Sequence, residues 1–324
     1  MIASLAAFTL AVLATATHTD TTFSVRPGTR LELNNFAGSI GVQTWTKNAV
    51  RVSADHSSRV TIEVENSGTT LDLQAVHWRG MPTTVDYQIT VPKWMGLELQ
   101  GVNTDISVEN SEAEVSAQTV QGDVTVSGGT KSVSATSVEG DVRISHASGK
   151  IECSSVNAGV SIAESNGQIL VSSINGEIVL RAIDSGDVEA STINGGVTYD
   201  GALKDAGSYR FSTHNGEIAV TVPERANATV SVATYNGEFS SSFPVQLKET
   251  RRGKRFNFTI GNGGARVELE SFQGEIRLRR PGDAEGLKSF QYREKQKEKD
   301  AEERALKEYE KAKRKNAEEG GQEP

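Results

Sequence analysis

The sequence predicts an all-β fold, specifically a parallel β-solenoid, and three observations support this prediction. A short motif of apolar, polar, Gly, polar and apolar residues recurs along the chain, as in SSINGEIVL, VEGDVRI and THNGEIAV. Aligning these motifs on their Gly gives a register of nine residues, and a fixed period is typical of a solenoid. Within each unit apolar and polar residues alternate, which indicates a short strand with one buried face.

The composition favours a thin, repetitive β fold. The chain has 324 residues, which is enough for a sizeable core, but only 36% are hydrophobic and 6% aromatic. The net charge of −8 gives no reason to expect a nucleic-acid partner, since that needs a clustered basic patch. Cys153 is the single cysteine, so we expect no internal disulfide and no cysteine-based metal site.

Residues 1–16 are predicted to be a signal peptide. An apolar run from Ile2 ends at Ala14-Thr15-Ala16, a small-residue cleavage signal that places the mature start near Thr17. The usual positive n-region is missing, so an uncleaved anchor is the alternative, although the run is shorter than the ~20 residues that span a bilayer. We expect an extracytoplasmic location (periplasm, cell surface or secreted) and no membrane span in the mature chain.

Residues 17–100 are predicted to form an irregular β cap at the N-terminal end. Short alternating runs such as RLELNNF, RVTIEVE and VDYQITVP indicate strands. A solenoid needs such caps because its terminal coils expose unpaired backbone groups. At the other end, the segment from RFNFTI to LRRPG is expected to close the sheet, with Arg277, Arg279, Arg280 and Pro281 blunting the final edge.

Residues 101–280 are predicted to form the solenoid itself. The third and fifth positions of each unit, such as Val142 and Ile144, are expected to point into the core. The eighth position is often apolar too, as at Val120 and Ile193, and is expected to turn inward at the corner. Two units form one coil, of 18 residues at first and about 21 near Gly216, so two parallel sheets should face each other across a narrow core.

The corners hold a column of turn residues to which we assign a structural role. Gly opens most units and suits a turn that needs a positive φ, while stacked Asn side chains satisfy the turn backbone and each other. A recognition surface is the alternative role for the Asn residues. The turn column consists of Asn157, Asn175, Asn194, Asn215, Asn236, Gly122, Gly140, Gly176, Gly195, Gly216 and Gly237.

Acidic residues follow the corner Gly in several coils and are the strongest candidates for catalysis. They are Asp105, Asp123, Asp141, Glu177, Glu217, Glu238 and Glu275. Stacked carboxylates would lie about 5 Å apart, similar to those of a retaining glycosidase. A catalytic pair, however, needs two different environments to separate its pKa values, and a repeated column gives every member much the same one. We therefore predict no catalytic residues and no enzymatic activity.

The sequence indicates no metal or cofactor. The nonapeptide of calcium-binding β-rolls requires G-G-x-G-x-D, which this repeat lacks. The five histidines (His18, His56, His77, His146 and His214) show no metal-ligand spacing. No phosphate-binding loop, dinucleotide fingerprint or nucleophile elbow occurs in the required strand-to-helix context. Cys153 stands at an inward fifth position and is interpreted as a core residue.

Residues 281–324 are predicted to be a charged tail, helical or disordered. Between Asp283 and Pro324 there are 11 Lys or Arg residues and 12 Asp or Glu residues. Several opposite charges stand at helical spacing, which favours a solvated helix. The apolar residues are too few for a sustained coiled-coil seam.

The repeated corners of the form apolar-Asn-Gly-acidic-apolar resemble those of the bacterial "putative adhesin" family of β-strand repeats, a domain of unknown function. The N-terminal run FSVRPGTRLELNNFAGSIGVQTW, followed by VRVSA and VDYQITVP, is similar as well. The chain also resembles the related head domain of autotransporter adhesins, named for its Gly-Ile-Asn motif. The resemblance covers about residues 23–280 and implies an exported, non-enzymatic envelope or surface protein, with no functional residues to carry over.

These observations favour a secreted protein that acts through its solenoid surface, in adhesion or as an envelope scaffold. Its expected partner is a surface glycan or an envelope protein. The first alternative is an envelope sensor or regulatory protein that uses the C-terminal tail. The second is a carbohydrate-active β-helix enzyme, in which the acidic residues would be confined to a few coils rather than spread evenly.

Overall fold

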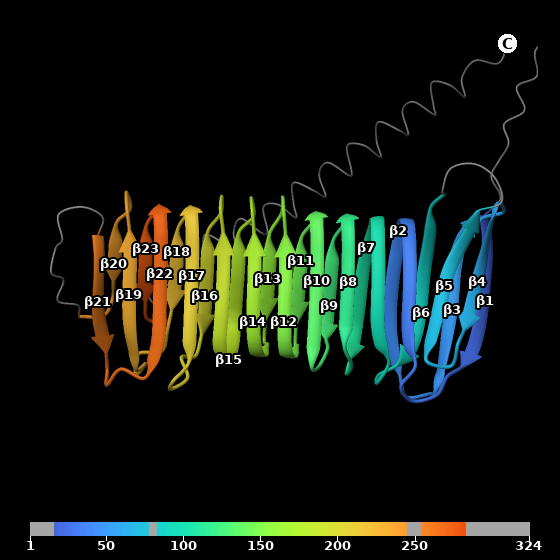
Figure 1. The fold of residues 1–324 in the computed structure, drawn as a ribbon, viewed down its shortest axis with the longest axis horizontal. Helices are drawn as coiled ribbons and strands as arrows, with labels where there is room; N and C mark the ends of the chain where they lie inside the picture. Colours follow the sequence, from blue (N-terminus) through green and yellow to red (C-terminus); the bar gives the residue numbers. More distant parts are fainter. Residues whose placement is uncertain (1–15, 78–82, 245–253, 283–324) are drawn as a thin grey trace, which may run out of the picture. The chain divides into compact units, whose positions relative to one another are not determined.

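The computed structural model describes residues 16–77, 83–244 and 254–282, and all regular elements in these ranges are β-strands. The strands stack side by side along one axis (Figure 1). The predicted all-β solenoid is therefore confirmed. Residues 1–15 of the expected signal peptide lie outside the described residues, and so does the charged tail beyond Gly282.

The strands form two rows, one on each side of the core. The first row runs in the order β4 (Val60–Asn66), β5 (Thr70–His77), β2 (Arg30–Trp45), β7 (Gly96–Ser111), β8 (Val115–Gln121), β10 (Ser132–Glu139), β12 (Ser148–Ser155), β14 (Asn166–Ser173), β15 (Ile178–Thr192), β17 (Ser208–Asn215), β22 (Ala265–Gln273), β19 (Ala228–Thr234) and β21 (Lys254–Ile260).

The second row runs in the order β1 (Ala16–Ser24), β3 (Ala49–Ser57), β6 (Val85–Pro92), β2, β7, β9 (Val124–Gly128), β11 (Val142–Ser145), β13 (Val160–Ala163), β15, β16 (Val197–Gly201), β18 (Ile218–Thr221), β23 (Ile276–Arg279) and β20 (Phe239–Ser241). The long strands β2, β7 and β15 belong to both rows. They join the rows into one continuous hydrogen-bonded sheet.

The parallel register confirms the predicted period. Val133 pairs with Val115 on one side and with Ile151 on the other, so equivalent residues stand 18 positions apart (133 − 115 and 151 − 133). Between Val188 and Tyr209 the separation has grown to 21 positions (209 − 188). Because every coil repeats the same inward positions, equivalent side chains stack along the axis at the ~4.8 Å spacing of neighbouring strands.

The third and fifth positions form the core as predicted. Val142 and Ile144 are buried, as are their equivalents in the neighbouring coils, and together they make one continuous apolar cluster. Where the coils lengthen, the aromatic rings of Tyr199 and Phe211 fill the wider interior, with centroids 4.9 Å apart. Cys153 is part of this core, and burial raises the pKa of its thiol well above the usual range.

The C-terminal segment closes the first row with β21, as predicted, but its last strands do not close the second row, and that part of the prediction was wrong. Strand β22 lies between β17 and β19, and β23 lies between β18 and β20. The last coil in sequence is thus inserted between two earlier coils, and the terminal strands of the rows are β21 and β20. Arg277 and Arg279 consequently lie within the second row and do not blunt its final edge.

Strands that are distant in sequence also pair at the N-terminal end of the solenoid. Strand β2 pairs in parallel with β7, although β2 ends at Trp45 and β7 begins only at Gly96, and between them in sequence lie strands of the cap. Antiparallel pairs then terminate both rows, β4 with β5 in one and β1 with β3 in the other. At the opposite end, the antiparallel pair of β19 and β21 terminates the first row in the same way.

The inserted coil is also held by ion pairs. The Arg277 guanidinium donates to Glu217 Oε1 on the neighbouring coil at 2.7 Å and to Glu275 on its own coil. The hydrogen bond from Arg277 holds the pKa of Glu275 below its ordinary value. Since the folded-state pKa is depressed, the pair stabilises the fold above the unfolded-state pKa of about 4.3, and this contribution is lost as pH falls through the lower folded-state value.

We therefore expect Arg277→Gln to reduce the free energy of unfolding at pH 7 by about 1 kcal/mol and to have a smaller effect at pH 3. Urea unfolding at both pH values measures the difference. The control is Arg30→Gln, which removes a longer contact of 3.5 Å to Glu98 between more exposed side chains and should change stability less. An equal loss for Arg277→Gln at both pH values would contradict the pKa argument.

Candidate functional site at the stacked corner

One corner of the coil carries most of the residues that the sequence analysis singled out. In the coil that contains SSINGE, the corner consists of Ser173, Ile174, Asn175, Gly176 and Glu177. The parallel register places each of these residues beside its equivalent in the adjacent coils, for example Ser173 beside Ser155 and Thr192. The corner is therefore a set of five columns that run along the solenoid.

The first column is a buried row of hydroxyl groups, which we call the hydroxyl ladder. Its members donate to the corner carbonyl of the preceding coil. Ser137 donates to Gly122 at 2.9 Å, Ser155 to Gly140 at 3.0 Å, Ser173 to Ala158 at 3.2 Å, Thr192 to Gly176 at 3.0 Å, Thr213 to Gly195 at 2.8 Å and Ser271 to Gly216 at 3.1 Å. Each bond ties one coil to the next and satisfies a carbonyl that the sheet ladder leaves free.

Several of these hydroxyls also accept a bond from the corner of their own coil. The backbone N–H of Gly176 donates to Ser173 Oγ at 2.9 Å, and that of Ala158 donates to Ser155 Oγ at 3.3 Å. A hydroxyl can both donate and accept, so Ser or Thr suits this position in a way that an apolar side chain does not. This column was not predicted from the sequence, although Ser or Thr stands three residues before the corner residue in every one of these coils.

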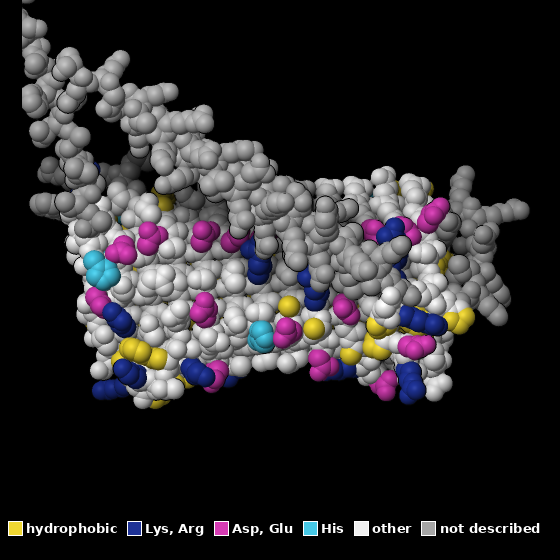
Figure 2. Space-filling view, turned by 180° about the vertical axis from the view of Figure 1, so that it is seen from behind, with side chains coloured by type: hydrophobic (Ala, Val, Ile, Leu, Met, Phe, Trp, Pro, Cys, Tyr) yellow, Lys and Arg dark blue, Asp and Glu magenta, His cyan; other side chains and the backbone are white. Residues whose placement is uncertain are grey.

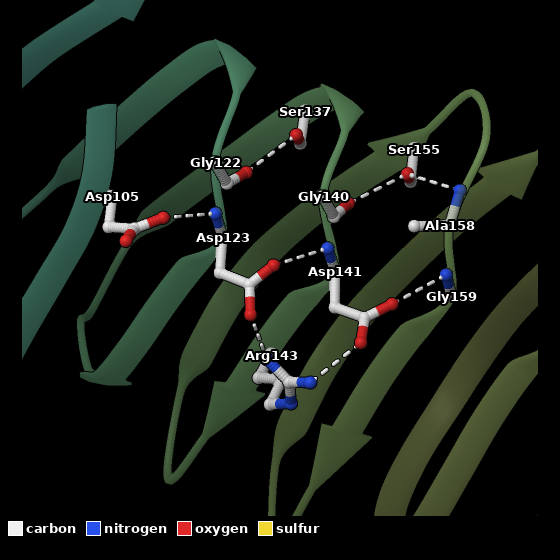
Figure 3. Close-up of polar contacts among 10 residues, drawn as sticks. All are labelled: Asp105, Gly122, Asp123, Ser137, Gly140, Asp141, Arg143, Ser155, Ala158 and Gly159. Atoms are coloured by element: carbon white, nitrogen blue, oxygen red, sulfur yellow. Dashed lines mark hydrogen bonds and ion pairs between the residues drawn. The ribbon is translucent and has the colours of Figure 1, made fainter. Parts of the chain in front are cut away.

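The corner glycines are required by close approach rather than by a positive φ. Of the six predicted, only Gly122 has one, at 136°. A Cβ added at Gly140 would lie 1.9 Å from the carbonyl oxygen of Gly122, and one at Gly216 would lie 1.9 Å from that of Gly195. Figure 3 shows the Gly122 and Gly140 carbonyls beside the hydroxyls that donate to them.

The Asn side chains form an amide ladder on the outside of the corner. Asn175 donates to Asn157 Oδ1 at 2.9 Å, Asn194 to Asn175 at 2.9 Å and Asn215 to Asn194 at 2.8 Å. Asn236 is separated from this ladder, because β22 places Gln273 beside Asn215.

The acidic column takes part in the same inter-coil bonding. Asp105 accepts the backbone N–H of Asp123 at 2.8 Å, Asp123 accepts that of Asp141 at 2.8 Å, and Asp141 accepts that of Gly159 at 2.9 Å. Arg143 bridges Asp123 and Asp141 at 2.9 and 2.6 Å (Figure 3). These carboxylates lie near one another as predicted, and one oxygen of each is occupied by a backbone donor.

The eighth position of the unit points outward, which corrects the prediction that it turns into the core. Val120, Ile174 and Ile193 are 45%, 43% and 48% exposed. The preceding residue belongs to the hydroxyl ladder and points inward. Because neighbouring residues of an extended strand point to opposite faces, the eighth residue points outward. The register aligns these residues into one column, which we call the ridge. It consists of Phe36, Val102, Val120, Val138, Val156, Ile174, Ile193, His214, Phe272 and Tyr235.

The remaining candidates do not converge on a reactive centre. Within residues 16–77, 83–244 and 254–282, no group of three His, Cys, Asp or Glu residues is placed to hold a metal ion. His146 contacts Glu164 at 3.0 Å on the surface, and His18 contacts Asp55 at 2.8 Å. The part of the chain that the structure describes also contains no helix long and apolar enough to cross a membrane.

Comparison with known proteins places most of the described fold in one family. The family model described as Toastrack DUF4097 matches residues 28–279. Similar solved structures include a "putative adhesin" from Parabacteroides distasonis (14% identity, TM-score 0.45, covering 81% of this chain and 97% of that one) and another from Bacteroides fragilis (14%, 0.41, 82% and 97%). A "putative lipid binding protein" from Parabacteroides distasonis is similar as well (12%, 0.41, 81% and 96%). No match was found among curated proteins.

We expect Gly140→Ala to reduce the free energy of unfolding by about 1–3 kcal/mol, because the new methyl group would overlap the Gly122 carbonyl and force adjacent coils apart. Thermal or urea unfolding measures the loss. Gly186→Ala is the matched control, since the nearest atom to an added Cβ there is a Lys204 side-chain carbon at 3.7 Å. Equal effects of the two substitutions would show that close approach at the corner is unimportant.

We expect Ser155→Ala to destabilise the fold by about 1–3 kcal/mol, since it leaves the buried Gly140 carbonyl without its hydroxyl donor. Ser155→Thr should restore stability, because Thr occupies the same column at Thr192 and Thr213. Ser161→Ala, on the outward side of β13, is the control. If Ser155→Ala unfolds at the same urea concentration as the control, the hydroxyl ladder does not stabilise the stack.

Proposed function

The chain belongs to the Toastrack DUF4097 family, and we propose that it is a non-enzymatic binding scaffold outside the cytoplasm that acts through the surface of its solenoid. The observation that carries this proposal is the ridge. It is a single file of outward apolar and aromatic side chains that crosses ten neighbouring strands. At a strand spacing of about 4.8 Å, its length is roughly 43 Å.

Exposed apolar surface of this extent favours contact with a partner. Scattered apolar side chains are normal on protein surfaces. A contiguous apolar file favours binding, because contact with a partner releases the water that hydrates it. The ridge is also rigid, because the hydroxyl ladder and the amide ladder fix the columns on either side of it. A rigid surface loses little conformational entropy when a partner binds.

The acidic column supports a structural role rather than catalysis. Each of Asp105, Asp123 and Asp141 accepts a backbone N–H from the next coil, so all three have the same structural contact. General acid–base catalysis by two carboxylates depends on a difference between their environments. Acidic and basic side chains are interspersed over the face in Figure 2, which is unlike the single-sign surface of a nucleic-acid-binding protein.

Export is compatible with the pairing of β1, because cleavage after Ala16 would leave residues 17–24 paired with β3. An exported protein of this kind meets envelope polymers and surface proteins, which are the partners expected from the sequence. The relation to autotransporter adhesins stays a prediction.

We expect residues 17–324 and a version that ends at Gly282 to bind native envelope fragments equally. Replacing three ridge residues together, Val120→Thr, Ile174→Thr and Ile193→Thr, should weaken that binding about tenfold or more, since a loss of ~1.4 kcal/mol has this effect. Leu170→Thr is the control, because Leu170 is 43% exposed but lies on β14 away from the ridge. A sedimentation assay with labelled fragments measures the affinity.

Two outcomes would contradict the proposal. Binding that is unchanged in the triple variant would show that the ridge is not the contact surface. Capture of a protein partner by the full-length chain alone would support the regulatory alternative, in which residues 283–324 carry the function. Retention of the wild-type unfolding transition in each variant excludes loss of the fold as the cause.

A further inference from the structure

The ridge changes character at its C-terminal end, where three rings stack. The His214 ring lies 4.6 Å from Phe272, centroid to centroid, with an angle of 4° between the planes. Tyr235 lies 4.9 Å from the other face of Phe272, at an angle of 9°. Tyr235 is the last member of the ridge and is 63% exposed, so its ring is accessible to a ligand.

This stack exists because of the inserted coil. Phe272 lies on β22, which runs between β17 and β19, so its ring separates His214 from Tyr235. The three residues stand far apart in sequence, at positions 214, 235 and 272, and share no motif.

A cavity of about 570 Å³ opens beside the stack. Its aromatic wall is formed by His214, Phe272 and Tyr235, and its other side by Ser212, Glu270 and Arg255. Ala233 lies between Glu270 and Arg255 in the strand register, and its small side chain leaves the space between them unfilled. The volume falls within the ~300–1,000 Å³ of typical small-molecule sites.

The hydroxyls deeper in the cavity are already engaged. Thr213 donates to Gly195, Ser271 donates to Gly216, and Thr234 accepts the N–H of Gly237. The outward column adds three polar side chains to the lining of the cavity. The Glu270 carboxylate contains acceptors, the Arg255 guanidinium contains donors, and the Ser212 hydroxyl can both donate and accept.

We propose that this cavity binds a pyranose ring of an uncharged glycan. One face of a pyranose carries only C–H groups, whose partial positive charge complements the negative face of the Tyr235 ring. The hydroxyls at the rim of the sugar are donors and acceptors at once, which matches a wall that holds a carboxylate, a guanidinium and a hydroxyl. The opposite charges of Glu270 and Arg255 favour neither an anionic nor a cationic ligand.

This inference rests on the proposed function, because it names the ligand of the same surface. It goes further in placing the contact at one end of the ridge and in assigning it to a sugar. The rest of the ridge would then contribute apolar contact to whatever polymer carries that sugar.

The test is an array of immobilised oligosaccharides, neutral and charged, probed with residues 17–324. We expect binding to neutral oligosaccharides, a loss of tenfold or more for Tyr235→Ala and for Ala233→Met, which fills the cavity, and near wild-type binding for Tyr235→Phe. Leu170→Ala is the control, because it shortens an exposed apolar side chain (43%) that belongs neither to the ridge nor to the lining of the cavity. Saturation-transfer NMR with soluble glucose and N-acetylglucosamine hexamers provides a second readout in solution.

Failure to bind any neutral oligosaccharide in both assays would overturn the inference, and so would binding that Tyr235→Ala and Ala233→Met leave unchanged. Binding restricted to charged oligosaccharides would overturn it as well. If envelope fragments still bind through the ridge in any of these cases, the proposed function stands and only the sugar site fails. Conversely, tyrosine-dependent glycan binding without capture of envelope fragments would support the site and contradict the wider function.

Discussion

The carbonyl oxygen of a corner residue lies against the Cα of the corner glycine in the next coil, and the neighbouring columns depend on this close approach. At Gly176 an added Cβ would lie 1.7 Å from the Ala158 oxygen, so only a hydrogen fits. The carbonyl also needs a donor, which Ser173 supplies. Because Ser173 must point inward to do so, Ile174 must point outward. One backbone contact thus accounts for Gly, for the hydroxyl ladder and for the exposed ridge.

Repetition converts these local requirements into long surface columns. Each coil repeats the same corner at the same height above its neighbour, so side chains of one kind stand in line over many strands. The amide ladder from Asn157 to Asn215 and the carboxylates from Asp105 to Asp141 are such columns, and both add bonds between coils. The side chains of the ridge from Phe36 to Ile193 are apolar and need no polar partner, which leaves this column available for binding.

Much of the fold could be predicted because the period and the alternation are properties of the chain itself. The two core residues of the motif, such as Val142 and Ile144, stand two positions apart in each unit. Both therefore point to the same face of an extended strand. The exposure of the ridge residues could not be predicted in the same way. Apolar residues at Val120 and Ile193 indicated burial, but whether a corner residue is buried depends on which neighbour satisfies the corner carbonyl, and that is a contact between coils.

The sequence by itself determined the solenoid, its coil length of 18 to 21 residues and the corner at which Asn and Gly recur, because these follow from spacing along one chain. Only the tertiary structure decided the order of the last coils. Strands β19, β21 and β22 have similar alternating patterns, and pairing between them is settled by side-chain packing and backbone bonding over long separations. The stack of His214, Phe272 and Tyr235 depends on that order, so the candidate sugar site is a property of the fold and not of any motif.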